Sequence, residues 1–291
     1  GQAPLQRADN GQIVETPSGE VYHTHLCSRP LPGLRRSPLG RETAIQKCEW
    51  RDDGWLYLAD GATVPRVEVP LPRDAIPMPP TERPSRRDFD ATDLPAEFQW
   101  LRTPLPERLF SLSARPGHLR LFGRESIGSW FEQALVARRQ EHFKFRAEAM
   151  LDLAPQDFQQ AAGLVLYYNR HKFHFLAVTH TPRLGRCLMV MSCLGDWPDG
   201  RLTFPLDQPI ALADGPVSLV ASVDHAALRF GYDAGDGLRM LEPQLDASIV
   251  SDEAGRGEHG SFTGSFVGMM AFDTSGRGLA ADFDWFDYQP E

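Results

Sequence analysis

Apolar and charged residues alternate along much of the chain, and this alternation predicts β-strands. Between Phe143 and Leu153 apolar side chains occupy every second position, and charged residues such as Lys144 and Asp152 stand between them. That spacing places one side of a strand in a core and the other in water. Asp-Gly, Pro-Gly and Gly-rich turns separate similar runs, so residues 88–291 are predicted to form a two-sheet β-sandwich. The further runs cover residues 164–168, 172–179, 187–193, 217–223, 228–232, 266–272 and 283–288.

Two hairpins are predicted before this region. Residues 12–29 contain two β-rich runs around a Pro-Ser-Gly turn, and residues 43–59 repeat the form around an Asp-Asp-Gly turn. Two hairpins give four strands, which is one blade of a β-propeller. A single blade leaves two apolar sheet faces exposed, so residues 1–63 are expected to be covered by other blades or by the following domain.

A proline-rich segment divides the chain. Seven prolines lie between Val64 and Arg87, and such a segment is extended and supplies few backbone donors to a sheet. We therefore predict a propeller blade at 1–63, a linker at 64–87 and a sandwich at 88–291. The segment from Trp130 to Gln140 stays open between strand and helix, because its Ala, Leu and Arg content also suits a helix.

Composition narrows the class of protein. The chain has 291 residues, 42% hydrophobic and 24% charged, which is typical of a folded protein. Its 25 glycines and 24 prolines indicate many short strands and turns, and hence an all-β class. Its net charge of −9 argues against nucleic acid or an anionic membrane as partner. No stretch of about 18 apolar residues is present to span a membrane. The start at Gly1-Gln2-Ala3-Pro4 suggests a fragment or a processed chain.

The four cysteines, Cys27, Cys48, Cys187 and Cys193, lie inside apolar strand-like runs without the close pairing of a zinc site. We expect reduced, buried thiols and therefore a reducing compartment, the cytoplasm.

Several motifs together resemble glycoside hydrolase family 43, in its β-xylosidase branch. The runs Pro38–Gln46, Val14–Pro17 and His25–Pro30 look like the closing part of that family's five-bladed propeller. Later motifs resemble the concanavalin-like C-terminal sandwich of the same enzymes, among them Asp88-Phe89-Asp90, Gly123-Arg124-Glu125-Ser126, Phe262-Thr263-Gly264 and Ala281-Asp282-Phe283-Asp284. The resemblance implies an all-β chain with one blade of a five-bladed propeller followed by a concanavalin A-like two-sheet sandwich.

The resemblance also implies an activity. It is inverting hydrolysis of β-1,4-xylo-oligosaccharides from the non-reducing end, with or without α-L-arabinofuranosidase activity. The substrate would be a xylo-oligosaccharide or an arabinoside, and the partners would be the remaining propeller blades and further copies in a homo-oligomer. The family's Asp base, Glu acid and pKa-tuning Asp lie on earlier blades, so no catalytic residue is assigned here and this chain alone is expected to be inactive.

A second class of function stays open, a non-catalytic carbohydrate-binding or assembly module. Concanavalin-like sandwiches support either use, because fold does not fix function. Exposed coplanar aromatics on one sheet would favour binding, but we expect the candidates Tyr167, Phe173 and Phe175 to line the core.

Arg41 is the first candidate site residue. Beside Glu42 it suits a structural ion pair, whereas the resemblance implies the arginine that grips the sugar at the pocket floor. Its planar fork can donate two hydrogen bonds to vicinal hydroxyls. The resemblance also implies a sandwich aromatic that narrows the propeller mouth, and Phe262 is the candidate, with a core phenylalanine as the alternative.

Other polar residues are weaker candidates. Glu15 and Glu42 lie near turns, but a strand glutamate is more often solvated or paired with a cation, so we expect no catalytic role. Asn10 stands where the resembling enzymes have a pocket histidine, which weakens transfer of that role. His23 and His25 share one side of a strand, where a metal would need a third ligand.

The D-F-D motifs suggest a calcium site. The first and last strands of such sandwiches are commonly neighbours, so Asp88 and Asp282 are predicted to converge on Ca²⁺ through hard oxygen ligands. The alternative is a pair of solvated aspartates on edge strands.

Overall fold

The computed structural model describes residues 3–80, 83–195, 200–255 and 262–291, and these form three antiparallel sheets. The first is a curled four-stranded sheet in the order β1-β2-β3-β4, which confirms both predicted hairpins and the blade-like N-terminal unit. Its strands are β1 (Gln6–Glu15), β2 (Val21–Ser28), β3 (Glu42–Trp50) and β4 (Leu56–Leu58).

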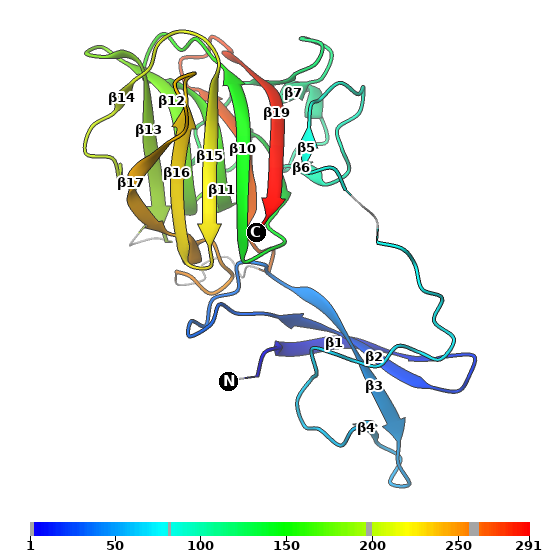
Figure 1. Cartoon of the computed structure of the whole chain (residues 1–291). Helices are drawn as coiled ribbons and strands as arrows, with labels where there is room; N and C mark the ends of the chain where they lie inside the picture. The colour runs from blue at the N-terminus through cyan, green and yellow to red at the C-terminus, as the bar shows by residue number, and fades with distance from the viewer. Residues whose placement is uncertain (1–2, 81–82, 196–199, 256–261) are drawn as a thin grey trace.

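The other two sheets pack face to face as a concanavalin A-like sandwich (Figure 1). The eight-stranded sheet has the order β17-β16-β15-β10-β19-β8-β7, with β5 also paired to β19. The seven-stranded sheet has the order β14-β13-β12-β11-β18-β9-β6. The eight-stranded sheet contains β5 (Arg86–Arg87), β7 (Phe110–Ser111), β8 (Leu119–Phe122), β10 (Lys144–Asp152), β15 (Val217–Asp224), β16 (Ala227–Asp233), β17 (Arg239–Asp246) and β19 (Ala280–Pro290). The seven-stranded sheet contains β6 (Phe98–Trp100), β9 (Ala134–Arg139), β11 (Gln160–Asn169), β12 (Lys172–Thr181), β13 (Gly185–Leu194), β14 (Ile210–Ala211) and β18 (Phe266–Asp273).

The core between these sheets follows the predicted alternation. In β10, Phe145, Ala147, Ala149 and Leu151 are fully buried, and the residues between them are less so. The segment 130–140, for which the sequence suited either strand or helix, contains strand β9 and no helix. Its residues are buried in succession because the strand lies between β18 and β6 and is covered on both faces, which removes the alternation that identifies a strand.

A second apolar cluster covers the outer face of the seven-stranded sheet. Tyr167, Phe173 and Phe175 belong to it and are almost fully buried, as expected for core residues. They therefore offer no exposed aromatic platform. The four cysteines are also buried, and no disulfide forms within the described residues. Burial raises the thiol pKa of Cys27, Cys48 and Cys187.

The N-terminal unit lies below the sandwich, and residues 59–80 and 83–85, which run between them, contain no strand (Figure 1). Only two short 3-10 helices, η1 (Pro106–Arg108) and η2 (Ala247–Ile249), occur in the described ranges. None of the described helices has the length and apolar character needed to cross a membrane.

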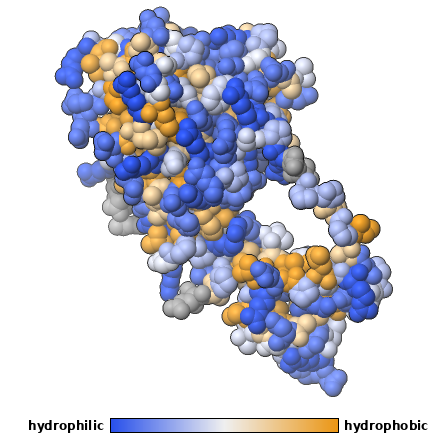
Figure 2. All heavy atoms as spheres, in the orientation of Figure 1, coloured by the Kyte–Doolittle hydropathy of each residue, from blue (hydrophilic) through white to orange (hydrophobic). Residues whose placement is uncertain are grey.

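The four-stranded sheet exposes large apolar side chains, and Figure 2 shows hydrophobic residues beside hydrophilic ones on the N-terminal unit. Exposed fractions reach 72% for Trp55 and 55% for Trp50, and are about half for Ile13 and Val14. This surface has the character of a sheet that another element would cover.

Candidate functional site

Arg41 and Phe262 meet where the N-terminal unit touches the sandwich. Arg41 directly precedes β3, after a turn that ends at Gly40, and Phe262 precedes β18. The Arg41 amide donates to the Phe262 carbonyl at 3.4 Å, and the guanidinium lies 5.1 Å from the centre of the Phe262 ring. The ring is 62% exposed, so it is a surface aromatic and not the core phenylalanine of the alternative prediction. The structure thus brings the two predicted substrate-binding residues together.

The ion-pair partner of Arg41 is Asp252, not the neighbouring Glu42. Arg41 Nη1 donates to Asp252 Oδ2 and lies 4.0 Å from Glu253 Oε1. The Asp252 side chain is completely buried, and its Oδ1 accepts hydrogen bonds from the Tyr168 hydroxyl at 2.6 Å and the Gly264 amide at 3.1 Å. Burial raises the pKa of Asp252, against the opposing effect of these donors.

The other two guanidinium nitrogens of Arg41 take no part in the ion pair with Asp252. Within the described part of the chain, Nε and Nη2 of Arg41 make no hydrogen bond to protein. An arginine has five N–H donors in a rigid fork, so the ion pair with Asp252 leaves donors for a ligand. The Arg41 side chain is 10% exposed, and Phe262 beside it is largely exposed. Arginine and ring together can hold a polyol by hydrogen bonding and by stacking on its C–H groups.

Two glycines allow the two units to approach closely. Gly40 and Gly264 both have left-handed backbones, with φ of 72° and 73°. A Cβ on Gly40 would lie 2.5 Å from the Gly264 nitrogen, and a Cβ on Gly264 would lie 2.7 Å from the Gly40 nitrogen. Ser265 N also donates to Pro38 O at 2.7 Å. The backbone on either side of Arg41 is therefore in direct contact with the sandwich.

Further charged contacts join the units around this point. Glu253 accepts from the Ser37 amide at 2.5 Å and pairs with Arg7 at 3.1 Å. Arg36 donates to Ser248 Oγ at 2.6 Å and to Asp246 Oδ2 at 3.1 Å. The segment 246–253 of the sandwich is thus the surface on which the N-terminal unit rests.

The glutamates considered for catalysis have ordinary positions. Glu42 accepts two hydrogen bonds from Arg29, at 2.8 and 2.7 Å, so it is a structural ion-pair partner. Glu15 is exposed at the end of β1. The ion-pair interpretation therefore holds for Glu42, whereas Arg41 turns to the sandwich.

Among the residues that the structure describes, His23, His25 and Asn10 lack the further ligands of a metal site. The rings of His23 and His25 stack with centroids 5.7 Å apart, and burial lowers the pKa of His23. Asn10 is exposed in an irregular part of β1, with φ of 43°. Among the described residues no group of three or more His, Cys, Asp or Glu side chains is placed to hold a metal ion.

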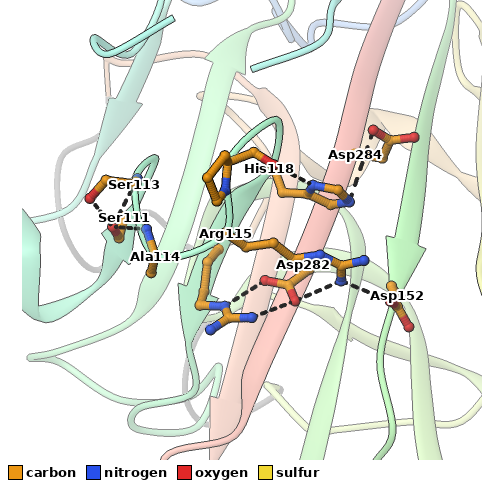
Figure 3. Close-up of polar contacts among 10 residues, drawn as sticks. Ser111, Ser113, Ala114, Arg115, His118, Asp152, Asp282 and Asp284 are labelled. Carbon is orange, nitrogen blue, oxygen red and sulfur yellow. Dashed lines mark hydrogen bonds and ion pairs between the residues drawn. The ribbon is translucent and has the colours of Figure 1, made fainter. Parts of the chain in front are cut away.

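Asp282 lies in a network of arginines (Figure 3). Both of its oxygens accept from Arg120, at 2.7 and 2.8 Å, and Oδ2 also accepts from Arg115 at 2.9 Å. Although burial opposes ionisation, these hydrogen bonds hold the pKa of Asp282 below its usual range. Arg115 also donates to Asp152 at 2.8 Å.

Asp88 does not join this network. The first and last sandwich strands do pair, but Asp88 directly follows β5, whose Arg87 is opposite Phe286, whereas Asp282 is opposite Arg120 of β8. The Asp88 carboxylate accepts from Arg86 at 2.7 Å. Guanidinium groups thus occupy both aspartates predicted as calcium ligands, and this geometry gives the calcium prediction no support.

The sequence prediction missed Asp252, Tyr168 and Lys172. Asp252 lies in an irregular loop with no periodic signal, and Tyr168 and Lys172 lie in strands whose residues read as core. An acidic pair, Asp252-Glu253, shortly after the apolar Ile249-Val250 was the available signal.

A blade-like sheet followed by a concanavalin A-like sandwich fits the C-terminal part of a class of glycoside hydrolases. A model of the β-xylosidase C-terminal concanavalin A-like domain matches residues 86–289, and a model of glycosyl hydrolases family 43 matches residues 1–56. The chain belongs to glycoside hydrolase family 43, and the resemblance inferred from its motifs is confirmed.

Relatives support this assignment over the whole chain. Xylosidase/arabinosidase 43B of Humicola insolens is 46% identical over 99% of this chain and 53% of its own length. The β-xylosidase of Bacillus subtilis is 38% identical over 98% of this chain and 54% of its own length. The crystal structure of xylan β-1,4-xylosidase from Bacillus halodurans superposes with a TM-score of 0.93 at 39% identity, over 99% of this chain and 54% of that one. The chain thus spans about half the length of the relatives it matches.

Proposed function

We propose that this chain works within a longer inverting glycoside hydrolase that releases pentose units from the non-reducing end of β-1,4-xylo-oligosaccharides. Arg41 and Phe262 bind the terminal sugar, and the carboxylates that act as base and acid lie on propeller blades outside residues 1–291. Relatives named as β-xylosidases and xylosidase/arabinosidases support the substrate class. The observation that carries the proposal is Arg41, held by Asp252 through one nitrogen, with its remaining donors beside an exposed aromatic ring.

The exposed apolar residues of the four-stranded sheet are consistent with further propeller blades packed against it. Trp50, Trp55 and Ile13 are each more than half exposed, and neighbouring blades of a propeller would bury such side chains. The carboxylates of an inverting pair stand about 6.5–9.5 Å apart, so both must reach the sugar that Arg41 binds.

The test uses the full-length product of the gene that encodes this chain, with p-nitrophenyl β-D-xylopyranoside and the matching α-L-arabinofuranoside as substrates. Arg41→Ala should lower kcat/KM by about 10- to 100-fold, the loss expected for one or two charge-assisted hydrogen bonds. Arg41→Lys should recover little, because the ammonium lacks the fork. Phe262→Ala should alter the preference among xylobiose, xylotriose and xylotetraose.

Arg51 provides a matched control. It also stacks on an aromatic, Tyr57, at 4.2 Å in the same unit, but on the exposed hairpin between β3 and β4. Arg51→Ala should leave the kinetics unchanged. Unchanged kcat/KM in Arg41→Ala, or hydrolysis by a preparation containing only residues 1–291, would contradict the proposal. Sugar binding without hydrolysis by the full-length protein would favour the binding-module alternative.

A further inference from the structure

The loop that carries Asp252 is fixed from inside the sandwich by a buried lysine. Lys172 is 1% exposed, and its ammonium donates to the carbonyls of Ser251 at 2.8 Å and Ala254 at 2.9 Å. The same ammonium lies 4.0 Å from the centre of the Tyr168 ring. These hydrogen bonds stabilise the buried charge and fix the two carbonyls that accept them. The backbone on both sides of Asp252 is therefore held in place.

The carboxylate itself is fixed by a division of roles between its two oxygens. Oδ1 accepts from the Tyr168 hydroxyl and the Gly264 amide, both of which belong to the sandwich. Oδ2 accepts from Arg41, which belongs to the N-terminal unit. Because Oδ1 is held from two directions, the carboxylate cannot rotate to follow the arginine. The arginine must instead adopt the direction that the carboxylate sets.

We propose that Asp252, held by Tyr168 and by the loop that Lys172 anchors, is a positioning residue that aims the Arg41 guanidinium at the sugar. The sandwich thereby determines substrate affinity without touching the reacting atoms. This inference rests on the proposed function, because it takes Arg41 as the sugar ligand.

Glu253 is an alternative carboxylate partner for Arg41. Glu253 lies 4.0 Å from Arg41 Nη1 and already accepts the Ser37 amide and pairs with Arg7. In Asp252→Asn the side-chain oxygen can still serve Tyr168 and Gly264, but an NH₂ group then faces the guanidinium. Two donors cannot bond to each other, so the Arg41 guanidinium should turn toward Glu253 and leave the orientation in which it binds the sugar.

The experiment measures kcat and KM separately in the full-length gene product, again with p-nitrophenyl β-D-xylopyranoside. Asp252→Asn should raise KM by about tenfold or more and leave kcat within about twofold, as expected when binding that is equal in ground and transition states is lost. Tyr168→Phe, which keeps the charge, should raise KM by about threefold. Tyr167→Phe is the matched control, since it removes an equally buried hydroxyl bonded to Gln133 at 2.9 Å on the opposite face of the same strand.

A double-mutant cycle separates this inference from the proposed function. If Asp252 acts through Arg41, Asp252→Asn should change KM by less than about twofold in an Arg41→Ala background. Additive effects, or an unchanged KM in Asp252→Asn while Arg41→Ala is impaired, would overturn the positioning role. An unimpaired Arg41→Ala would overturn the proposed function instead. Should Asp252→Asn fail to fold, the contrast between Tyr168→Phe and Tyr167→Phe decides, and equal KM values for these two variants would reject the inference.

Discussion

The contact between Gly40 and Gly264 gives a sharp test of how the two units are joined. In Gly264→Ala the new Cβ would lie 2.7 Å from the Gly40 nitrogen and from the carbonyl carbon and oxygen of Leu39. All three are backbone atoms, so no side-chain rotation relieves the overlap. The turn before Arg41 would have to move away from the sandwich.

The size of the effect follows from two contributions. A non-glycine residue in the left-handed region costs about 1–2 kcal/mol. Overpacking against backbone adds about 1–3 kcal/mol. Gly264→Ala should therefore destabilise the protein by about 2–5 kcal/mol in total. Gly276→Ala is the matched control, because Gly276 has a φ of 77° but nothing within 4 Å of an added Cβ, so only the first contribution applies.

Calorimetric melting of the full-length gene product compares the two variants. At about 2–4 °C per kcal/mol, Gly276→Ala should lower Tm by roughly 2–8 °C, and Gly264→Ala should lower it by several degrees more. Gly264→Ala should also raise KM for the xyloside, because Arg41 moves with the turn, whereas Gly276→Ala should not. Equal shifts in Tm and unchanged KM for both variants would refute the reasoning.

Two further predictions concern the arginine network around Asp282. Burial raises the pKa of Asp282, but the hydrogen bonds from Arg120 and Arg115 outweigh burial and hold this pKa below the ordinary value of 3.8. The ionised carboxylate should therefore stabilise the fold above about pH 4, and this stabilisation should be lost as the pH falls through the folded-state pKa. Asp282→Asn should flatten the dependence of Tm on pH below 4, while the exposed Asp284→Asn should not, and a dependence that persists in Asp282→Asn would assign it elsewhere. Since arginines occupy the oxygens of Asp282, millimolar Ca²⁺ or EDTA should leave Tm unchanged. A rise of Tm with calcium that Asp88→Asn abolishes would instead support the calcium site. Such a rise would be measurable, because a ligand at 100 times its Kd adds about 2.7 kcal/mol to the free energy of unfolding.

The strands could be predicted from the sequence better than the contacts between them. In β10 the alternation of Phe145 to Leu151 with charged residues identified a strand, because one face meets the core and the other meets solvent. The same rule could not decide β9, which is buried on both faces. The aspartates of the D-F-D motifs look alike in sequence, but the strand register places Asp282 opposite Arg120, whereas Asp88 bonds to Arg86 two residues earlier in the chain.

The candidate site shows the same limit more clearly. Arg41 and Phe262 were found through their motifs, but the partner of Arg41 was not, because Asp252 is 211 positions away in an irregular loop. No periodic pattern records a contact between a turn of one unit and a loop of another. The close packing of Gly40 on Gly264, together with the contacts of Arg36 and Glu253 around it, brings the charges together.

The division of this ion pair between two units has a consequence for the role of the sandwich. Arg41 belongs to the N-terminal unit, whereas its counter-ion and the aromatic ring beside it belong to the sandwich. An N-terminal unit without the sandwich would keep Arg41 but lose the fixed carboxylate that directs it. The arginine would then be solvated and free to rotate, and part of any binding energy would be spent in ordering it. If Arg41 binds the sugar as proposed, the sandwich contributes to that binding by supplying the rigid half of a shared contact.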